Sequence, residues 1–377
     1  MHPVLAYLRE QQEPLLADLE AFVRLETPSY DKAALDRLGG LLLEKFAAVG
    51  ARGEALAQPE RGDHLRFEWG EGEGQVLLLC HRDTVFSQRD IERNPLRREN
   101  GRLFGPGAFD MKAGFTQVLW ALRTMQQLKL RPRRKVVMLI TSDEEIGSAT
   151  SRPLIEAEAR RSAACLVLEP ALGEAGALKT WRKGVGEYRL QVSGIAAHAG
   201  VEPTRGASAI GELAVQVLRL HALTDLEAGT TVNVGVIKGG SRPNVIAAEA
   251  EAVIDVRVMT AAEGRRLDGV IQALQPVNPR CRLAVSGGIE RLPMVRNEKT
   301  VALYQQAAAI AMELGLGDLP ESGTGGGSDG NFTSGVGCPT LDGLGPVGDG
   351  AHTFDEYIVI DRLPERTALL VRLLESV

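Results

Sequence analysis

Three short, almost uninterrupted apolar runs constrain the fold of this chain most strongly. They are Gln75–Cys80 (QVLLLC), Val136–Thr141 (VVMLIT) and Cys165–Leu168 (CLVL). Such runs are typical of strands that are covered on both faces. Between the first two, apolar residues recur at helical spacing over Met111–Lys129. Strands that alternate with helices predict an α/β domain with a mixed, mainly parallel sheet flanked by helices.

The middle of the chain has a different order of elements. We predict strands at Val185–Ser193, Thr231–Ile237, Ile246–Met259 and Arg282–Ser286, and helices at Gly206–His221 and Ala261–Leu274. This βαββαβ order predicts a small ferredoxin-like α+β sandwich with its helices on one face.

After the sandwich the α/β pattern resumes. We expect a helix at Lys299–Gly315, a strand at Cys338–Gly343 and a closing helix at Ile360–Glu375. A chain of 377 residues also exceeds what one hydrophobic core usually organises. We therefore predict an inserted domain at 182–295 that interrupts a catalytic domain formed by residues 1–181 and 296–377.

Composition excludes several classes of function. The net charge of −6 leaves no basic surface for nucleic acid. No apolar stretch is long enough to span a bilayer, and the first residues lack the basic start and apolar run of a secretory signal. The four cysteines are scattered without a CxxC pair, as expected of reduced thiols. We expect a cytoplasmic protein that has no membrane partner.

Acids and histidines follow the predicted strands or precede the long helix. They are His81 and Asp83, Asp110, Glu144 and Glu145, Glu169, and His352. Open parallel sheets bind ligands at the carboxyl ends of their strands, so we expect these side chains to converge. Each alone can be a solvated loop residue. Together they would repel one another or stay unpaired without a cation among them. Imidazole and carboxylate ligands suit zinc, with manganese and cobalt as alternatives.

The spacing of these residues suggests individual roles. His81 and Asp83 are two residues apart, so on an extended strand end they point the same way. Asp83 can then accept the second ring N–H of His81 and fix its tautomer. The adjacent Glu144 and Glu145 point in different directions. One of them can bind metal while the other takes a proton from water.

Seven motifs resemble the M20-type metallopeptidase family, and within it the branch of glutamate carboxypeptidase (carboxypeptidase G). The family also contains aminoacylase and succinyl-diaminopimelate desuccinylase. In chain order the motifs are HRDTV, GPGAFDMKAG, SDEEIGS, LEP, AAHAG, GGGSDG and GAHTFDEY. Each motif alone is weak, but their order and spacing extend the resemblance over nearly the whole chain.

The resemblance implies roles for the acids and histidines. His81, Asp110 and Glu169 would hold one zinc ion, and Asp110 would bridge to a second. Glu145 and His352 would complete the second site. Asp83 would orient His81, while Glu144 would be the general base that activates water and later protonates the leaving nitrogen. The peptide bond after Asp110 is often cis in such relatives.

The resemblance also implies residues for substrate. In dimeric relatives the residue matching His198 reaches into the partner's site and stabilises the oxyanion. Without the resemblance, a histidine in a Gly/Ala loop is more often a turn residue. Asn244 matches a position that contacts substrate, and Arg257 and Arg291 match residues that clamp a carboxylate. Surface ion pairing is the alternative for both arginines. Ser328, in the glycine-rich loop, is a further candidate contact.

Three functions are compatible with this sequence. The leading hypothesis is a di-zinc carboxypeptidase acting on short peptides or N-acyl amino acids, with glutamate as a candidate product. It would form a homodimer through the inserted domain. The alternative is an N-acyl amino acid deacylase of the acetylornithine or succinyl-diaminopimelate type. A metal-binding protein without catalysis is the third, but Glu144 and every expected ligand are present.

Overall fold

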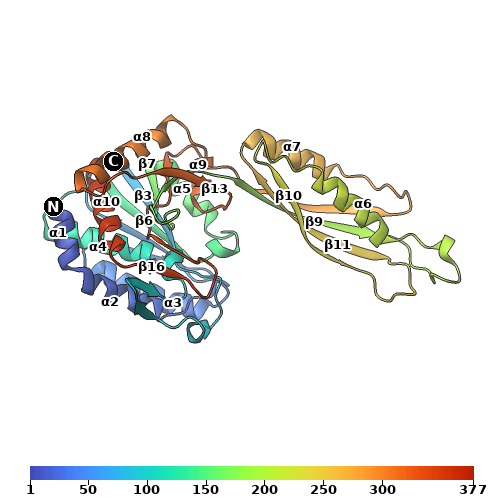
Figure 1. The fold of residues 1–377 in the computed structure, drawn as a ribbon, viewed down its shortest axis with the longest axis horizontal. Helices are drawn as coiled ribbons and strands as arrows, with labels where there is room; N and C mark the ends of the chain where they lie inside the picture. Colours follow the sequence, from blue (N-terminus) through green and yellow to red (C-terminus); the bar gives the residue numbers. More distant parts are fainter. The chain divides into compact units, whose positions relative to one another are not determined.

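The computed structural model describes residues 1–377 and divides the chain into two compact units. Unit 1 comprises Met1–Trp181, Met294–Thr324 and Ser328–Val377. Unit 2 comprises Arg182–Pro293 together with Gly325–Gly327. Figure 1 shows helices on both sides of the sheet in unit 1, and an open sheet with helices in unit 2.

Unit 1 is built on a six-stranded sheet in the order β1-β2-β6-β3-β7-β14. The strands are β1 (Arg52–Leu56), β2 (His64–Trp69), β3 (Gln75–His81), β6 (Lys135–Thr141), β7 (Ser162–Val167) and β14 (Thr340–Leu341). The last four in the sheet order run parallel, whereas β2 pairs antiparallel with β6 and with β1. The mixed, mainly parallel sheet is therefore confirmed.

Both faces of this sheet are covered by helices. Leu77 and Leu79 of β3 pack with Ile155 and Phe332, whereas Val76 and Leu78 belong to a larger core on the other face. Each buried leucine contributes roughly 1.5–3 kcal/mol to stability. The helices of unit 1 are α1 (Pro3–Glu10), α2 (Gln12–Val23), α3 (Lys32–Ala47), α4 (Ala113–Gln127), α5 (Arg152–Arg161), α8 (Glu298–Leu314), α9 (Gly330–Gly335) and α10 (Arg362–Ser376). Double coverage explains why β3, β6 and β7 are apolar almost throughout.

Two smaller sheets in unit 1 were not predicted. One contains β15 (Gly348–Asp349), β16 (Tyr357–Val359), β5 (Arg102–Phe104) and β4 (Arg97–Glu99), and the other pairs β13 (Glu321–Thr324) with β8 (Leu178–Arg182). Strands of two to five residues with several charged side chains give no clear periodicity. The pairing of β16 with β5 places the chain after His352 beside the chain before Asp110.

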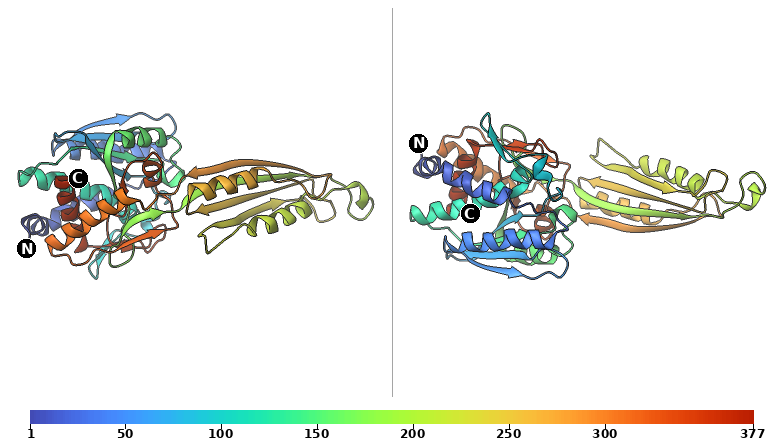
Figure 2. Two further views of the ribbon diagram at one scale, coloured as in Figure 1. Left: turned by 90° about the horizontal axis from the view of Figure 1, so that it is seen from above. Right: turned by 90° about the horizontal axis from the view of Figure 1, so that it is seen from below.

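Unit 2 has the predicted ferredoxin-like fold. Its elements are β9 (Gly184–Ser193), α6 (Ala209–His221), β10 (Thr231–Gly239), β11 (Glu249–Val258), α7 (Ala261–Gln272) and β12 (Arg282–Arg291). The strands pair antiparallel in the order β10-β11-β9-β12. Figure 2 shows both helices on one face of this sheet, where Leu213 and Leu267 join a core that contains Tyr188 and Ile254.

One predicted strand was too short. We ended it at Ser286, but β12 continues to Arg291. Gly287 has a φ of +98°, and a Cβ atom there would lie 2.1 Å from the backbone oxygen of Glu187. Glycine at this position therefore allows close approach of β9, rather than ending the strand.

None of the helices combines the length and apolar character needed to cross a bilayer. Cys80, Cys165, Cys281 and Cys338 are all buried and free.

Candidate metal centre

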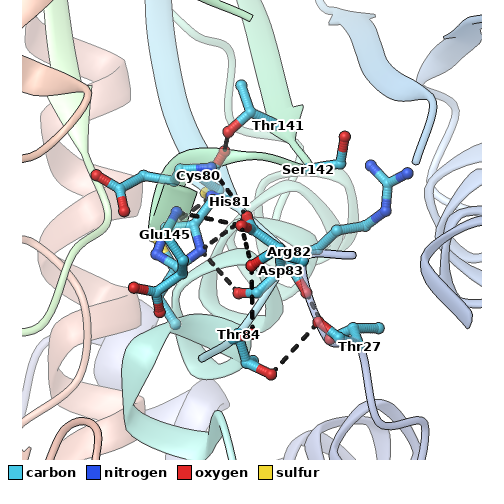
Figure 3. Close-up of polar contacts among 12 residues, drawn as sticks. Thr27, Cys80, His81, Arg82, Asp83, Thr84, Thr141, Ser142 and Glu145 are labelled. Atoms are coloured by element: carbon cyan, nitrogen blue, oxygen red, sulfur yellow. Dashed lines mark hydrogen bonds and ion pairs between the residues drawn. The ribbon is translucent and has the colours of Figure 1, made fainter. Parts of the chain in front are cut away.

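His81 and Asp83 lie where β3 ends at the carboxyl edge of the main sheet. The His81 ring is buried, and its Nδ1 atom is 3.0 Å from the backbone oxygen of Asp83 and 3.5 Å from Oδ1 of the same residue. The backbone carbonyl is thus the nearer acceptor, although we had expected the carboxylate. Arg82 points away from His81, as alternation along a strand requires (Figure 3).

The Asp83 carboxylate also organises the turn that carries two glutamates. It accepts hydrogen bonds from the backbone N–H groups of Glu144 (3.2 Å) and Glu145 (3.1 Å) and from Ser29 Oγ (2.9 Å). Asp83 therefore fixes the position of this turn relative to His81. The turn and the His81 ring thus both contact the buried carboxylate of Asp83.

Asp110 joins His81 and Glu169 in a first group of candidate ligands. The Nε2 atom of His81 lies 3.1 Å from Asp110 Oδ1 and 3.4 Å from Glu169 Oε1. Glu169 comes two residues after β7 ends, and Asp110 lies in the turn that precedes α4. The peptide bond between Asp110 and Met111 is cis.

The other oxygen of Asp110 belongs to a second group. His352 Nε2 lies 3.4 Å from Asp110 Oδ2 and 3.2 Å from Glu145 Oε2. His352 lies in the loop between β15 and β16. In each group, one candidate ligand atom from every residue lies within 4.8 Å of the others. Asp110 therefore presents one oxygen to each group.

The electrostatics of these groups favour a cation. Burial raises the pKa of Glu145 to about 7, and the nearby Asp110 carboxylate adds to the rise. Hydrogen bonds to Asp110 and Glu145 raise the pKa of His352 to about 11. Burial alone would lower the pKa of His81, but hydrogen bonds to Asp110, Asp83 and Glu169 raise it well above its usual value. Without metal, the acids are balanced by protonated histidines, whose charge a bound ion would replace.

The ligand spacing also fits a metal. Two ligands that are each about 2.1 Å from a tetrahedral ion lie about 3.4 Å apart. The four histidine–carboxylate separations above range from 3.1 to 3.4 Å. Two imidazoles and three carboxylates are a donor set that suits zinc, and also manganese or cobalt. The residues present therefore fit two metal ions.

Glu144 precedes the candidate ligand Glu145 in the chain but belongs to neither group. It begins the short 3₁₀ helix Glu144–Ile146, and its side chain is partly exposed. A carboxylate in the same turn as a candidate ligand, but outside the ligand set, suits proton transfer.

Ser328 is not exposed at the surface of the protein. Its side chain is buried, and its Oγ donates a hydrogen bond to Asp342 Oδ2 (2.8 Å) and accepts one from the Gly330 N–H (3.1 Å). The predicted substrate contact does not fit this environment. We had read the glycine-rich segment as a substrate-lining loop beside the metals, whereas Ser328 is buried just before α9 begins.

The remaining predicted residues lie in unit 2. His198 and Asn244 are exposed on neighbouring segments, since the Ala199 N–H donates to the backbone oxygen of Asn244 (3.0 Å). Arg257 of β11 and Arg291 of β12 both pair with Val185 of β9, from opposite sides, so they share one row of the sheet.

The two arginines of this row differ in environment. The guanidinium of Arg257 binds Asp255 Oδ2 at 2.7 Å, which is the ion pair that we had left open as the alternative. Arg291 is buried. The alignment of Arg257 and Arg291 could not be predicted from the sequence, because it depends on the register in which the strands pair.

Two buried ionisable residues near Asp110 were missed. The Glu356 carboxylate accepts hydrogen bonds from the backbone around Asp110, and burial raises its pKa to about 8. Lys112 donates to the backbone oxygen of Leu25 (2.8 Å), and burial lowers its pKa to about 8. Both residues occur in motifs noted above, GAHTFDEY and GPGAFDMKAG. Charged residues in loops are usually solvated, so the motifs were their only signal.

Together, this fold and its acid–histidine groups define a metal-dependent hydrolase. The profile of Peptidase family M20/M25/M40 matches residues 77–376, and the chain belongs to this family.

Individual relatives differ in the reaction named for them. The chain is 28% identical to carboxypeptidase G2 of Pseudomonas sp. (strain RS-16), over 97% of this chain and 89% of that protein. Its fold is similar to aminopeptidase PepT from Bacillus cereus (TM-score 0.77, 20% identity, 97% of this chain and 98% of that one). It is also similar to the metallo-carboxypeptidase Sso-CP2 from Sulfolobus solfataricus (TM-score 0.75, 17% identity, 96% and 98%). The shared fold therefore does not select one substrate.

Proposed function

We propose that this chain is a di-zinc carboxypeptidase that hydrolyses the amide bond of short peptides or N-acyl amino acids. The observation that carries this proposal is the placement of Asp110, whose two oxygens face two separate histidine–carboxylate groups. Zinc is the preferred metal, with manganese or cobalt as substitutes. A C-terminal glutamate is the first candidate for the released amino acid.

The residues of this chain would divide the work of hydrolysis. Bound metal ions would polarise the scissile carbonyl and lower the pKa of water. Glu144 takes a proton from the attacking water, and the water oxygen bonds to the carbonyl carbon. The carbon–nitrogen bond then breaks as Glu144 gives the proton to the leaving nitrogen. Asp83 holds the turn that carries Glu144 by accepting a hydrogen bond from its backbone N–H.

Several features support carboxypeptidase over deacylase activity. Carboxypeptidase G2 matches almost the whole chain. The segments Gly105-Pro106-Gly107 and Leu168-Glu169-Pro170 resemble the carboxypeptidase version of these motifs. In unit 2, Arg257 and Arg291 stay candidates for a substrate carboxylate, and Arg257 would have to exchange its ion pair with Asp255 for this role. A pocket of about 640 Å³ next to Glu145, lined in part by Tyr30 and Phe86, provides room for another part of the substrate.

The test is a substrate panel with metal-analysed protein, with and without a chelator. The panel contains N-acyl-glutamate, small dipeptides, N-acetylornithine and N-succinyl-diaminopimelate. We expect release of the C-terminal amino acid from the first two classes, and loss of that release with chelator. Preference for the last two would favour the deacylase. Two bound ions without turnover of any of these compounds would favour the non-catalytic alternative.

We also propose that the chain forms a homodimer through unit 2. Strand β10 is at the edge of its sheet, and Val236 and Ile237 on it are 46% and 57% exposed. Leu218 on the adjacent α6 is 72% exposed. An unpaired edge strand with exposed apolar side chains favours pairing with another strand. In such a dimer, His198 and Asn244 would serve the site of the other copy.

Sedimentation velocity is expected to give twice the chain mass for the wild type and a shift towards monomer for Ile237→Lys. A charge on the edge strand opposes strand pairing. Met312→Lys changes an exposed residue of α8 in unit 1 and serves as the control. An active wild-type monomer would remove His198 from the catalytic residues.

A further inference from the structure

The side chain of Glu356 fills a site formed by backbone N–H groups before α4. Its side chain is 0% exposed, and its carboxylate accepts hydrogen bonds from the N–H groups of Gly107, Phe109 and Asp110, each at 2.8 Å. Converging N–H groups of this kind form a concavity that binds anions. Here the acceptor is the carboxyl group of a side chain of the protein itself.

Glu356 also belongs to the loop that carries His352. It lies four residues after His352, and its backbone oxygen accepts from the Gly105 N–H (3.3 Å) and from Asn94 Nδ2 (3.3 Å). The residues that follow it form β16, which pairs with β5. The side chain and the backbone of Glu356 thus join the His352 loop to the turn that carries Asp110.

The second group of candidate ligands depends more than the first on contacts between loops. In the first group, His81 ends β3 and Glu169 comes shortly after β7, so both are held by the main sheet. In the second group, Glu145 lies in a 3₁₀ turn and His352 in a loop. The position of His352 relative to Asp110 is therefore set by contacts between loops.

We propose that Glu356 is a positioning residue that holds Asp110 and His352 at the spacing required by the second metal ion. This inference rests on the proposed two-metal function. Metal ligands need placement to within about 0.5 Å, which residues behind the ligands must enforce. A glutamine at position 356 has the same shape, but its NH₂ group would face backbone N–H donors. An alanine there would leave three N–H groups without their acceptor.

The test measures metal binding in the full chain. Metal-depleted wild type, Glu356→Gln and Glu356→Ala are titrated with zinc by calorimetry, and Tm is recorded for each. The matched control is Glu158→Gln. Glu158 in α5 is also buried, and its carboxylate binds Arg66 Nε and Gln75 Nε2 at 2.8 Å, as part of neither metal group.

We expect the weaker of the two zinc-binding steps to lose about 10–100-fold in affinity in both Glu356 variants, as is usual when a group behind a metal ligand is removed. The tighter step should change less, and Glu158→Gln should lower Tm while leaving both steps unchanged. If Glu356→Gln lowers Tm and both zinc affinities stay at the wild-type values, Glu356 is merely structural and the proposal is overturned. A wild type that binds a single ion would instead overturn the two-metal function, and the positioning role with it.

Discussion

Replacing Glu144 by alanine is expected to lower kcat by about 10²–10⁴-fold while the chain keeps its bound metal. Glu144 belongs to neither candidate ligand group, so its removal takes away a proton carrier and no ligand. Its backbone N–H still binds Asp83, so the turn with Glu145 should stay in place. The measurement pairs steady-state kinetics with metal analysis of the same sample.

Glu144→Gln is the matched variant, because it keeps the size of the side chain and removes only its ability to carry the proton. An unchanged KM with a reduced kcat would place the loss in the transition state rather than in substrate binding. Loss of zinc from Glu144→Ala in proportion to activity would show that Glu144 is a ligand, and that the general base lies elsewhere.

Asp110→Ala is expected to lose both metal ions and nearly all activity. Its two oxygens lie 3.1 Å from His81 Nε2 and 3.4 Å from His352 Nε2, so one truncation removes a ligand from each group. The affinity for both ions should fall by more than the roughly 10–100-fold that loss of an outer partner causes. Metal content after dialysis is the measurement.

The control for Asp110→Ala is Glu156→Ala, which removes an acid of α5 whose hydrogen-bond partners are Arg152 and Arg160. This control should retain the wild-type metal content. An Asp110→Ala protein that still carries two ions per chain would refute the bridging role. A protein that keeps one ion would assign Asp110 to a single site.

The main sheet and the convergence of acids could be predicted because each follows from local sequence. Strands covered on both faces are apolar throughout, as in β3 and β6. The carboxyl ends of parallel strands meet at one edge, which brings His81 close to Glu169. These inferences need only the order of elements along the chain.

Other features depend on contacts between distant segments, and the sequence did not reveal them. Glu356 is buried where the backbone of residues 107–110 presents N–H groups to its carboxyl group. The sequence around Ser328 suggests a loop residue, but its Oγ donates a hydrogen bond to Asp342, fourteen residues later. Glycine usually weakens a strand, but Gly287 lies within β12, where a Cβ atom would meet the backbone of β9. In each case a tertiary contact overrides the local preference.

The most direct test of the central claim is a zinc titration of metal-depleted protein that follows hydrolysis of an N-acyl-glutamate and bound metal together. We predict no activity without metal, and activity that rises until two ions are bound per chain. Full hydrolysis by protein that is free of metal would contradict this account.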